Sequence, residues 1–183
     1  MKIAIIIGHH ENGKGAYSKY FGQHEFDFYK KVCMYVHFVG AKFETRIFEH
    51  DKNISGYSTR VRATAAKVNE WGANLVICLH FNSFNKRANG CETLYFYASK
   101  KGKAYGELFN SMAADMFDVK NRGMKALTNT SDRGFREVQA TKAPTILVEP
   151  FFGDNDEDCE RVATHRRMAC LINGFMSRVH ELD

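Results

Sequence analysis

Apolar residues in this chain follow two different periods. Short runs of mostly apolar, often β-branched residues are typical of buried strands, and longer stretches with apolar residues every three or four positions are typical of amphipathic helices. The runs predict strands at residues 2–7, 42–48, 74–79, 91–97 and 145–148. The longer period predicts helices at residues 25–39, 55–71 and 102–117, and a long closing helix within residues 156–182.

Glycines and polar residues separate these elements. Gly40 and Gly72 follow the first two predicted helices and are natural stops, because glycine tolerates the left-handed backbone found at helix ends. Residues 118–143 are polar and contain Gly123 and Gly134. This composition favours a long functional loop or a short strand pair over a helix.

Strands that alternate with helices are typical of an α/β fold. We therefore expect one twisted, mostly parallel or mixed sheet with helices on both faces, and a ligand site at the carboxyl edge of its strands. A chain of 183 residues suffices for one domain with a real core, and the sequence has no linker rich in Ser, Gly or Pro. We expect one catalytic domain that spans residues 1–183.

Composition and charge exclude several classes of protein. The net charge of +5 fits ordinary solubility or a general attraction to polyanions. No long basic run indicates a nucleic-acid partner, and no apolar segment is long enough to insert stably in a membrane. The first apolar run is too short for a signal peptide, so we expect synthesis in the cytoplasm.

The cysteines stand at scattered positions and form no CxxC pair. An odd number at such spacings indicates neither a disulfide framework nor a zinc knuckle, so we expect core thiols in a reducing compartment. The five are Cys33, Cys78, Cys91, Cys159 and Cys170.

Four residues that can carry chemistry stand where a predicted strand ends or a helix begins. His9, His80 and Glu149 each follow an apolar run, and Glu25 opens the first helix. In an open α/β sheet these positions share one edge. Two histidines and a carboxylate there can hold a catalytic zinc ion with one position open, and a second carboxylate can serve as base. The sequence therefore predicts a metalloenzyme site.

Each of these positions has a competing interpretation. His10 competes with His9, since adjacent side chains of an extended segment point to opposite sides and only one can face the metal. The helix dipole also favours an acidic residue at Glu25, and His24 beside it is an alternative ligand. Desolvation by the proline and two phenylalanines after Glu149 raises a carboxylate pKa toward that of a general base, but a structural ion pair would account for Glu149 equally well.

At these residues the chain resembles the zinc-dependent N-acetylmuramoyl-L-alanine amidases of the amidase-3 family, which occur in bacteria and in phage endolysins. The resemblance is ordered and covers nearly the whole chain, although Ile-Ile-Gly-His replaces the usual Asp-x-Gly-His opening and Pro150 replaces a small or apolar residue. It is carried by Gly8-His9, Gly15-Ala16, Glu25, Thr45-Arg46, Asp51, Ser58, Arg62, Leu79-His80-Phe81-Asn82-Ser83, Gly90-Cys91-Glu92, Arg122-Gly123-Met124-Lys125, Leu147-Val148-Glu149 and Phe151-Phe152.

The resemblance implies a function and a role for each site residue. It implies that His9, Glu25 and His80 bind Zn²⁺, and that Glu149 is the base for hydrolysis of the amide between N-acetylmuramic acid and L-alanine in peptidoglycan. Two rival functions are a zinc peptidase that acts within the stem peptides, and a wall-binding domain with a degenerate site.

Substrate contacts and cellular role are open to further interpretations. Asn82 either orients the substrate or, with Ser83, caps a turn. Arg133 or Arg136 binds carboxylates of the peptide, or both are solvated loop charges.

We expect a monomer that reaches the wall after release, as a phage endolysin does. A sporulation or autolytic amidase, or a domain of a larger secreted protein, is the alternative.

Overall fold

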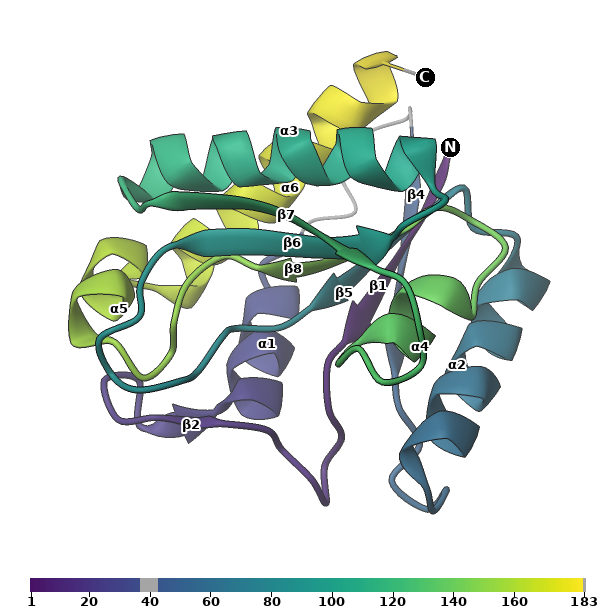
Figure 1. Ribbon diagram of the computed structural model, residues 1–183, viewed down its shortest axis with the longest axis horizontal. Coiled ribbons are helices and arrows are strands. Elements are labelled where there is room, and N and C mark those ends of the chain that lie inside the picture. Colours follow the sequence, from purple (N-terminus) through teal and green to yellow (C-terminus); the bar gives the residue numbers. More distant parts are fainter. Residues whose placement is uncertain (37–42, 183) are drawn as a thin grey trace.

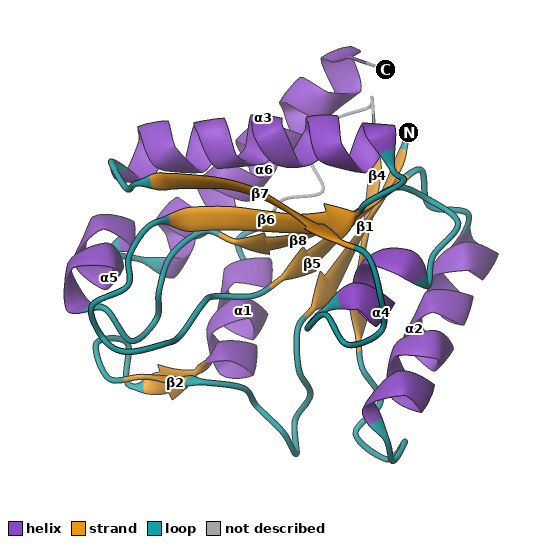
Figure 2. Ribbon diagram, viewed as in Figure 1, coloured by secondary structure: helices purple, strands orange, loops and turns teal. Residues whose placement is uncertain are grey.

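Six strands form one mixed sheet at the centre of the protein (Figures 1 and 2). The computed structural model describes residues 1–36 and 43–182. In the order β4-β1-β5-β8-β6-β7, the first four strands are parallel, β6 runs antiparallel to β8, and β7 is parallel to β6. The strands are β1 (Lys2–Ile7), β4 (Glu44–Glu49), β5 (Leu75–Leu79), β6 (Cys91–Phe96), β7 (Asn121–Leu127) and β8 (Thr145–Glu149), and a separate two-stranded ribbon comprises β2 (Tyr17–Ser18) and β3 (Gln23–His24).

Helices cover both faces of the sheet, which confirms the predicted fold class. Successive side chains of a strand point to opposite faces, so Ile3, Ile5 and Ile7 of β1 enter one apolar core while Ala4 and Ile6 enter the other. The first core is closed by α1 (Glu25–Cys33), α3 (Lys100–Phe117), α5 (Asp156–Val162) and α6 (His165–Leu182), and the second by α2 (Tyr57–Trp71) and α4 (Phe135–Gln139). In the described part of the chain, no helix is both long and apolar enough to cross a membrane.

The first helix is shorter than its apolar period predicts. α1 ends at Cys33, whereas we predicted a helix over residues 25–39. The amides of Tyr35 and Val36 bond to carbonyls three residues earlier, so apolar side chains keep reaching the core through a turn without a helix. The predicted end, at residues 39–40, lies outside the described residues.

The polar segment at residues 118–143 contains a strand and a short helix, where we expected a loop or a strand pair. The strand is β7, which pairs with β6 at the edge of the sheet. Most of its side chains are exposed or half-buried, so it lacks the apolar run that identifies a central strand. The helix α4 has only five residues, too few for a helical period to show in the sequence.

The closing segment contains the long helix that we predicted, α6, and before it a short helix, α5, that we did not predict. The break falls between α5 and α6, at Ala163, which has a positive φ of 59°. Neither glycine nor proline marks the position. The break was therefore not predictable from helix-stop residues.

Four of the five cysteines are buried, as expected for core thiols, and all five are free. Cys170 on α6 is exposed, so the expectation of a core position is wrong for this residue. Its neighbours Ala169 and Leu171 are buried instead.

The sheet topology brings several strand ends to one edge. β1, β5 and β8 are parallel and end there, while the antiparallel β6 begins there. Register aligns Glu92 at the start of β6 with Glu149 at the end of β8. The edge therefore carries the residues that follow β1, β5 and β8 and the residues that open β6.

Phe109 and Phe84 allow a matched test of the helical layer. Phe109 on α3 is fully buried and its ring centroid lies 5.2 Å from that of Phe175 on α6, whereas Phe84 is 78% exposed. Phe109→Ala should lower the free energy of unfolding by about 3–5 kcal/mol, because it leaves a cavity in the core. Phe84→Ala should change it by less than about 0.5 kcal/mol. Urea unfolding measures both, and equal effects would contradict the described packing.

Candidate active site

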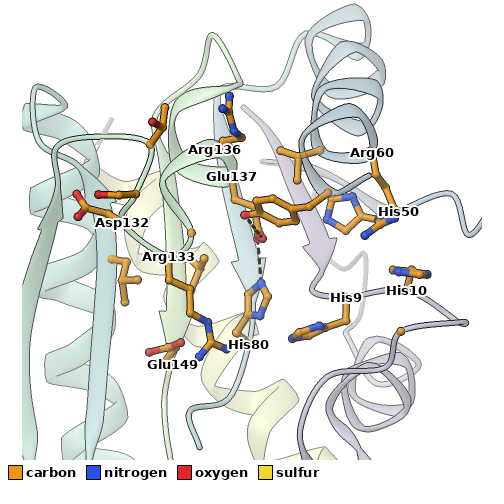
Figure 3. Close-up of a pocket in the computed structure, with 18 residues that line it drawn as sticks. His9, His10, His50, Arg60, His80, Asp132, Arg133, Arg136, Glu137 and Glu149 are labelled. Carbon is orange, nitrogen blue, oxygen red and sulfur yellow. Dashed lines mark hydrogen bonds and ion pairs between the residues drawn. The ribbon is translucent and has the colours of Figure 1, made fainter. Parts of the chain in front are cut away.

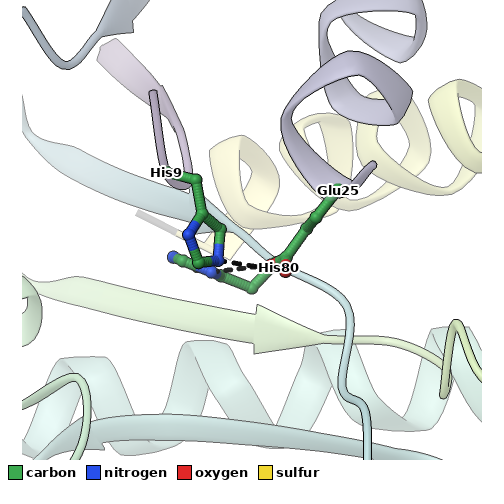
Figure 4. Close-up of side chains that lie close together, drawn as sticks. All are labelled: His9, Glu25 and His80. Carbon is green, nitrogen blue, oxygen red and sulfur yellow. Dashed lines mark hydrogen bonds and ion pairs between the residues drawn. The ribbon is translucent and has the colours of Figure 1, made fainter. Parts of the chain in front are cut away.

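Three side chains converge at the carboxyl edge of the sheet (Figure 4). Glu25 lies between two histidines, with Oε2 3.0 Å from His9 Nε2 and Oε1 2.8 Å from His80 Nδ1. One ligand atom from each residue lies within 4.8 Å of the others. The structure thus brings together the three residues predicted to bind a metal, which come from the ends of β1 and β5 and the start of α1.

Hydrogen bonds between α1 and the end of β5 hold this arrangement. The amide of Glu25 donates to the Ala16 carbonyl at 2.9 Å, which fixes the start of α1 against the loop after β1. The buried Tyr29 hydroxyl donates to the His80 carbonyl at 2.6 Å, and the amide of Phe81 donates to Glu25 Oε1 at 3.1 Å. Glu25 on α1 and His80 after β5 are therefore positioned relative to each other by bonds to the backbone.

Two glycines make room for the ligand side chains. A Cβ on Gly8 would lie 2.4 Å from the ring of His80, and a Cβ on Gly15 would lie 2.5 Å from the ring of His9 and 2.7 Å from Glu25 Oε2. The residue with a positive φ, 66°, at the end of β1 is His9 itself. Gly8 therefore provides space for the His80 ring.

The donor set fits a zinc ion. Two imidazole nitrogens and a carboxylate oxygen, with one position left for water, are a known catalytic zinc set. His9 Nε2 and Glu25 Oε2 are buried, and neither makes a well-directed hydrogen bond to any described residue, so a shared cation would satisfy both. Although burial opposes ionisation, the hydrogen bond of His80 and the charges of His80 and His9 lower the pKa of Glu25 to about 2. The carboxylate is therefore ionised at neutral pH, as a metal ligand must be.

The alternative ligands lie outside this cluster. His10 forms an isolated bridge with Gly13. His24 Nδ1 hydrogen-bonds with the Gly15 carbonyl at 3.1 Å, and its ring packs edge-on against Tyr17. Among the described residues, the group of side chains able to share a metal includes neither His10 nor His24.

Glu149, the predicted base, ends β8 beside the cluster and is 7% exposed. Asn82 Nδ2 donates to Glu149 Oε2 and to Glu92 Oε1, at 2.8 Å each. Burial raises the pKa of Glu149 to about 7, the charge of His80 opposes the shift, and the charge of Glu92 adds to it. Burial also opposes ionisation of Glu92, but Arg122, whose Nε donates to Glu92 Oε2 at 2.8 Å, lowers the pKa of that carboxyl. Asn82 thus holds the carboxylate of Glu149, a contact that we did not predict for it.

Sequence reasoning missed a second carboxylate beside His80. Glu137 on α4 is 8% exposed, and its Oε2 lies 2.9 Å from His80 Nε2. The Tyr57 hydroxyl donates to Glu137 Oε1 at 3.0 Å. No strand-end position signals Glu137, because it belongs to a five-residue helix in the polar segment.

A cavity of about 290 Å³ opens onto these residues (Figure 3). Its basic lining consists of His10, His50, Arg60, Arg133 and Arg136, together with the histidines of the cluster. Arg133, predicted to contact the substrate, reaches toward Glu149 and His80, whereas Arg136 lies further out near Glu137 (Figure 3). Burial lowers the pKa of His50 to about 4 despite the negative charge of Glu137, so His50 is neutral at pH 7.

Residues 3–177 match the family of N-acetylmuramoyl-L-alanine amidases. The chain belongs to this family. The match spans all the motifs that carry the resemblance seen in the sequence, which is thereby confirmed. No curated protein matches the amidase in sequence.

Solved structures of amidase catalytic domains share the fold. The catalytic domain of the CD27L endolysin, which targets Clostridia difficile, is 25% identical with a TM-score of 0.79, and the alignment covers 97% of each chain. The catalytic domain of CwlV, an N-acetylmuramoyl-L-alanine amidase from Bacillus (Paenibacillus) polymyxa var. colistinus, is 20% identical with a TM-score of 0.79 over 100% of each chain. The amidase AmiC2 of Nostoc punctiforme is 23% identical with a TM-score of 0.76, over 99% of this chain and 97% of that one.

Two glycines with positive φ provide a matched test of the cluster. Gly15 has a φ of 77° and touches His9 and Glu25, whereas Gly22 has a φ of 64° and nothing within 4 Å of its Cβ position. Both changes to alanine carry a backbone cost of roughly 1–2 kcal/mol. Only Gly15→Ala also displaces ligand side chains, so it alone should weaken zinc binding, by at least about tenfold. Competition with a chromogenic chelator measures the affinity, and equal affinities for the two variants would contradict the described geometry.

Proposed function

We propose that this amidase uses a zinc ion to hydrolyse the amide between the lactyl group of N-acetylmuramic acid and the L-alanine of the stem peptide, which degrades the cell wall. The observation that carries the proposal is the His9–Glu25–His80 cluster, of which His9 and His80 line one cavity together with Glu149. Membership of the amidase family, over residues 3–177, supports the choice of bond.

The division of roles follows from the environments of the two carboxylates. His9, Glu25 and His80 would hold the zinc ion, which supplies polarisation of the amide carbonyl and a lowered pKa for water. Glu149 accepts the proton of the attacking water and returns it to the leaving amine of L-alanine. A pKa of about 7 suits both transfers, because Glu149 is partly ionised as base and can release the proton afterwards. Asn82 keeps the carboxylate of Glu149 in place through its hydrogen bond to Oε2.

Arg133 and Arg136 are proposed to bind carboxylates of the stem peptide. Both line the cavity, and Figure 3 shows Arg133 near Glu149 and Arg136 near Glu137. A guanidinium pairs well with a carboxylate because two parallel N–H bonds match its two oxygens.

A zinc peptidase that cuts within the stem peptide is the rival reaction, and a wall-binding domain with a degenerate site is the rival class. Digestion of purified peptidoglycan with and without a chelator, with mass analysis of the products, separates the three. We expect release of intact stem peptides that begin at L-alanine, abolished by the chelator and restored by zinc. New ends within the peptide would indicate the peptidase, and bound zinc without release would indicate the binding domain.

Glu149→Ala tests the proposed base. The variant should retain zinc, because Glu149 is outside the ligand group, but its rate of stem-peptide release should fall by about 10²–10⁴-fold through loss of proton transfer. His80→Ala is the matched comparison, since it should lose zinc itself. Metal content and release rate are measured on the same preparations, and near-normal hydrolysis by Glu149→Ala would remove this residue from the mechanism.

The arginine contacts have their own test. Arg133→Ala and Arg136→Ala should each raise KM for a stem-peptide substrate by about tenfold, the loss expected for one charged hydrogen-bond partner of about 1.5 kcal/mol. Arg178→Ala, which removes an equal charge from an exposed position on α6, should leave KM unchanged. For a substrate with amidated carboxyl groups, these variants should all have the same KM as the unchanged protein. Equal KM values for all the variants would show that the arginines are solvated loop charges.

A wall-degrading enzyme released from the cytoplasm, such as an endolysin, is the cellular role that we propose. The likeness to the catalytic domain of the CD27L endolysin supports this role. The protein would act on peptidoglycan as a monomer, and sedimentation at working concentration checks that state.

A further inference from the structure

Two carboxylates contact the imidazole of His80 from opposite sides. His80 Nδ1 lies 2.8 Å from Glu25 Oε1, and His80 Nε2 lies 2.9 Å from Glu137 Oε2. Because Glu25 also contacts His9, the Nδ1 side of the ring faces the metal-ligating cluster. The Nε2 side faces away from that cluster, toward α4.

Glu137 is itself tightly placed. Its side chain is 8% exposed, and its amide donates to the Gly134 carbonyl at 3.0 Å in the first turn of α4. The Tyr57 hydroxyl on α2 donates to Glu137 Oε1 at 3.0 Å, so each carboxylate oxygen has its own partner. A buried carboxylate with one oxygen on Tyr57 and the other on His80 has little freedom to rotate.

We propose that Glu137 is a positioning residue for the metal centre, an inference that rests on the zinc-dependent function proposed above. By accepting a hydrogen bond from Nε2–H, Glu137 fixes the proton of His80 on that nitrogen and leaves Nδ1 free to act as ligand. A carboxylate on the far nitrogen of a ligating histidine also orients the ring and raises its basicity. The polar segment at residues 118–143 therefore contributes to the metal site without supplying a ligand.

The same contact joins the metal centre to the substrate side of the cavity. Glu137 stands one residue after Arg136 and four after Arg133, the two arginines that line the cavity from this segment. The hydrogen bond to His80 ties α4 to the end of β5. Glu137 thus fixes the position of the substrate-facing segment relative to the metal ligands.

Zinc affinity of the purified full chain tests the proposal. Chelator competition should give a dissociation constant about 10- to 100-fold weaker for Glu137→Ala, the usual effect of losing such a partner. Glu137→Gln keeps an uncharged oxygen of nearly the same shape, so its affinity should fall between that of Glu137→Ala and the unchanged protein. Glu11→Gln is the matched control, since Glu11 is exposed and pairs with Lys52, and it should bind zinc normally.

A spectroscopic measurement separates positioning from general loss of structure. In the zinc-loaded protein, ¹⁵N-edited NMR should show the His80 ring with a slowly exchanging Nε2–H proton. The signal should shift or vanish in Glu137→Ala and shift less in Glu137→Gln, and ring signals of His24 should stay unchanged in both. Circular dichroism shows whether each variant is folded, and Glu137→Gln serves if Glu137→Ala is not.

Three results would overturn the inference. Unchanged zinc affinity in both Glu137 variants would show that His80 needs no such partner. A loss as complete as that of His80→Ala would make Glu137 a ligand. No zinc binding by the unchanged protein would remove the proposal together with the zinc-dependent function. Zinc binding without stem-peptide release would instead contradict only the proposed reaction, and the effect of Glu137 on affinity would still be expected.

Discussion

The site depends on a carboxylate buried between two histidines. Glu25 is 1% exposed, and an ionised group in such a place is costly unless other groups compensate its charge and fill its hydrogen-bonding sites. His80 and the amide of Phe81 hydrogen-bond to Glu25 Oε1, and His9 lies 3.0 Å from Oε2. These contacts require the end of β1, the start of α1 and the end of β5 to meet at one point. The space that they occupy exists only because neighbouring positions carry glycine. Much of the local fold at this edge follows from that single burial.

Two carboxylates of the candidate site acquire opposite properties from their surroundings. Histidines around Glu25 lower its pKa, whereas burial and the negative neighbour Glu92 raise that of Glu149. Pairs of titratable groups with pKa values driven apart are typical of sites that need one permanently charged group and one proton carrier. The antiparallel β6 is what makes the second environment possible, since its first residues reach the carboxyl edge of β8. A fully parallel sheet would place Glu92 at the opposite edge.

The sequence predicted structure correctly where burial imposes a hydrophobic pattern on a strand or places a residue at a strand end. Central strands could be predicted because both faces are covered, and the convergence of His9, His80 and Glu149 followed from the rule that parallel strands end at one edge. The roles of these residues stay predictions, while their proximity is now described. β7 and α4 were not predicted, because β7 is a mostly exposed edge strand and α4 is too short to show a helical period. The break at Ala163 was not predicted because a residue other than glycine adopts a positive φ there.

Glu137 shows why part of a catalytic site resists sequence reasoning. Its contact with His80 joins positions 57 residues apart, and nothing local to α4 requires a carboxylate there. The strand-end residues belong to the well-packed centre of the sheet, whereas the segment around α4 carries exposed and half-buried side chains that face the substrate. A functional site needs a rigid chemical centre and a supporting shell that keeps its geometry within fractions of an ångström. Here the supporting shell comes from the less regular segment around α4. The buried carboxylate of Glu137 fixes this segment against the end of β5 through its hydrogen bond to His80.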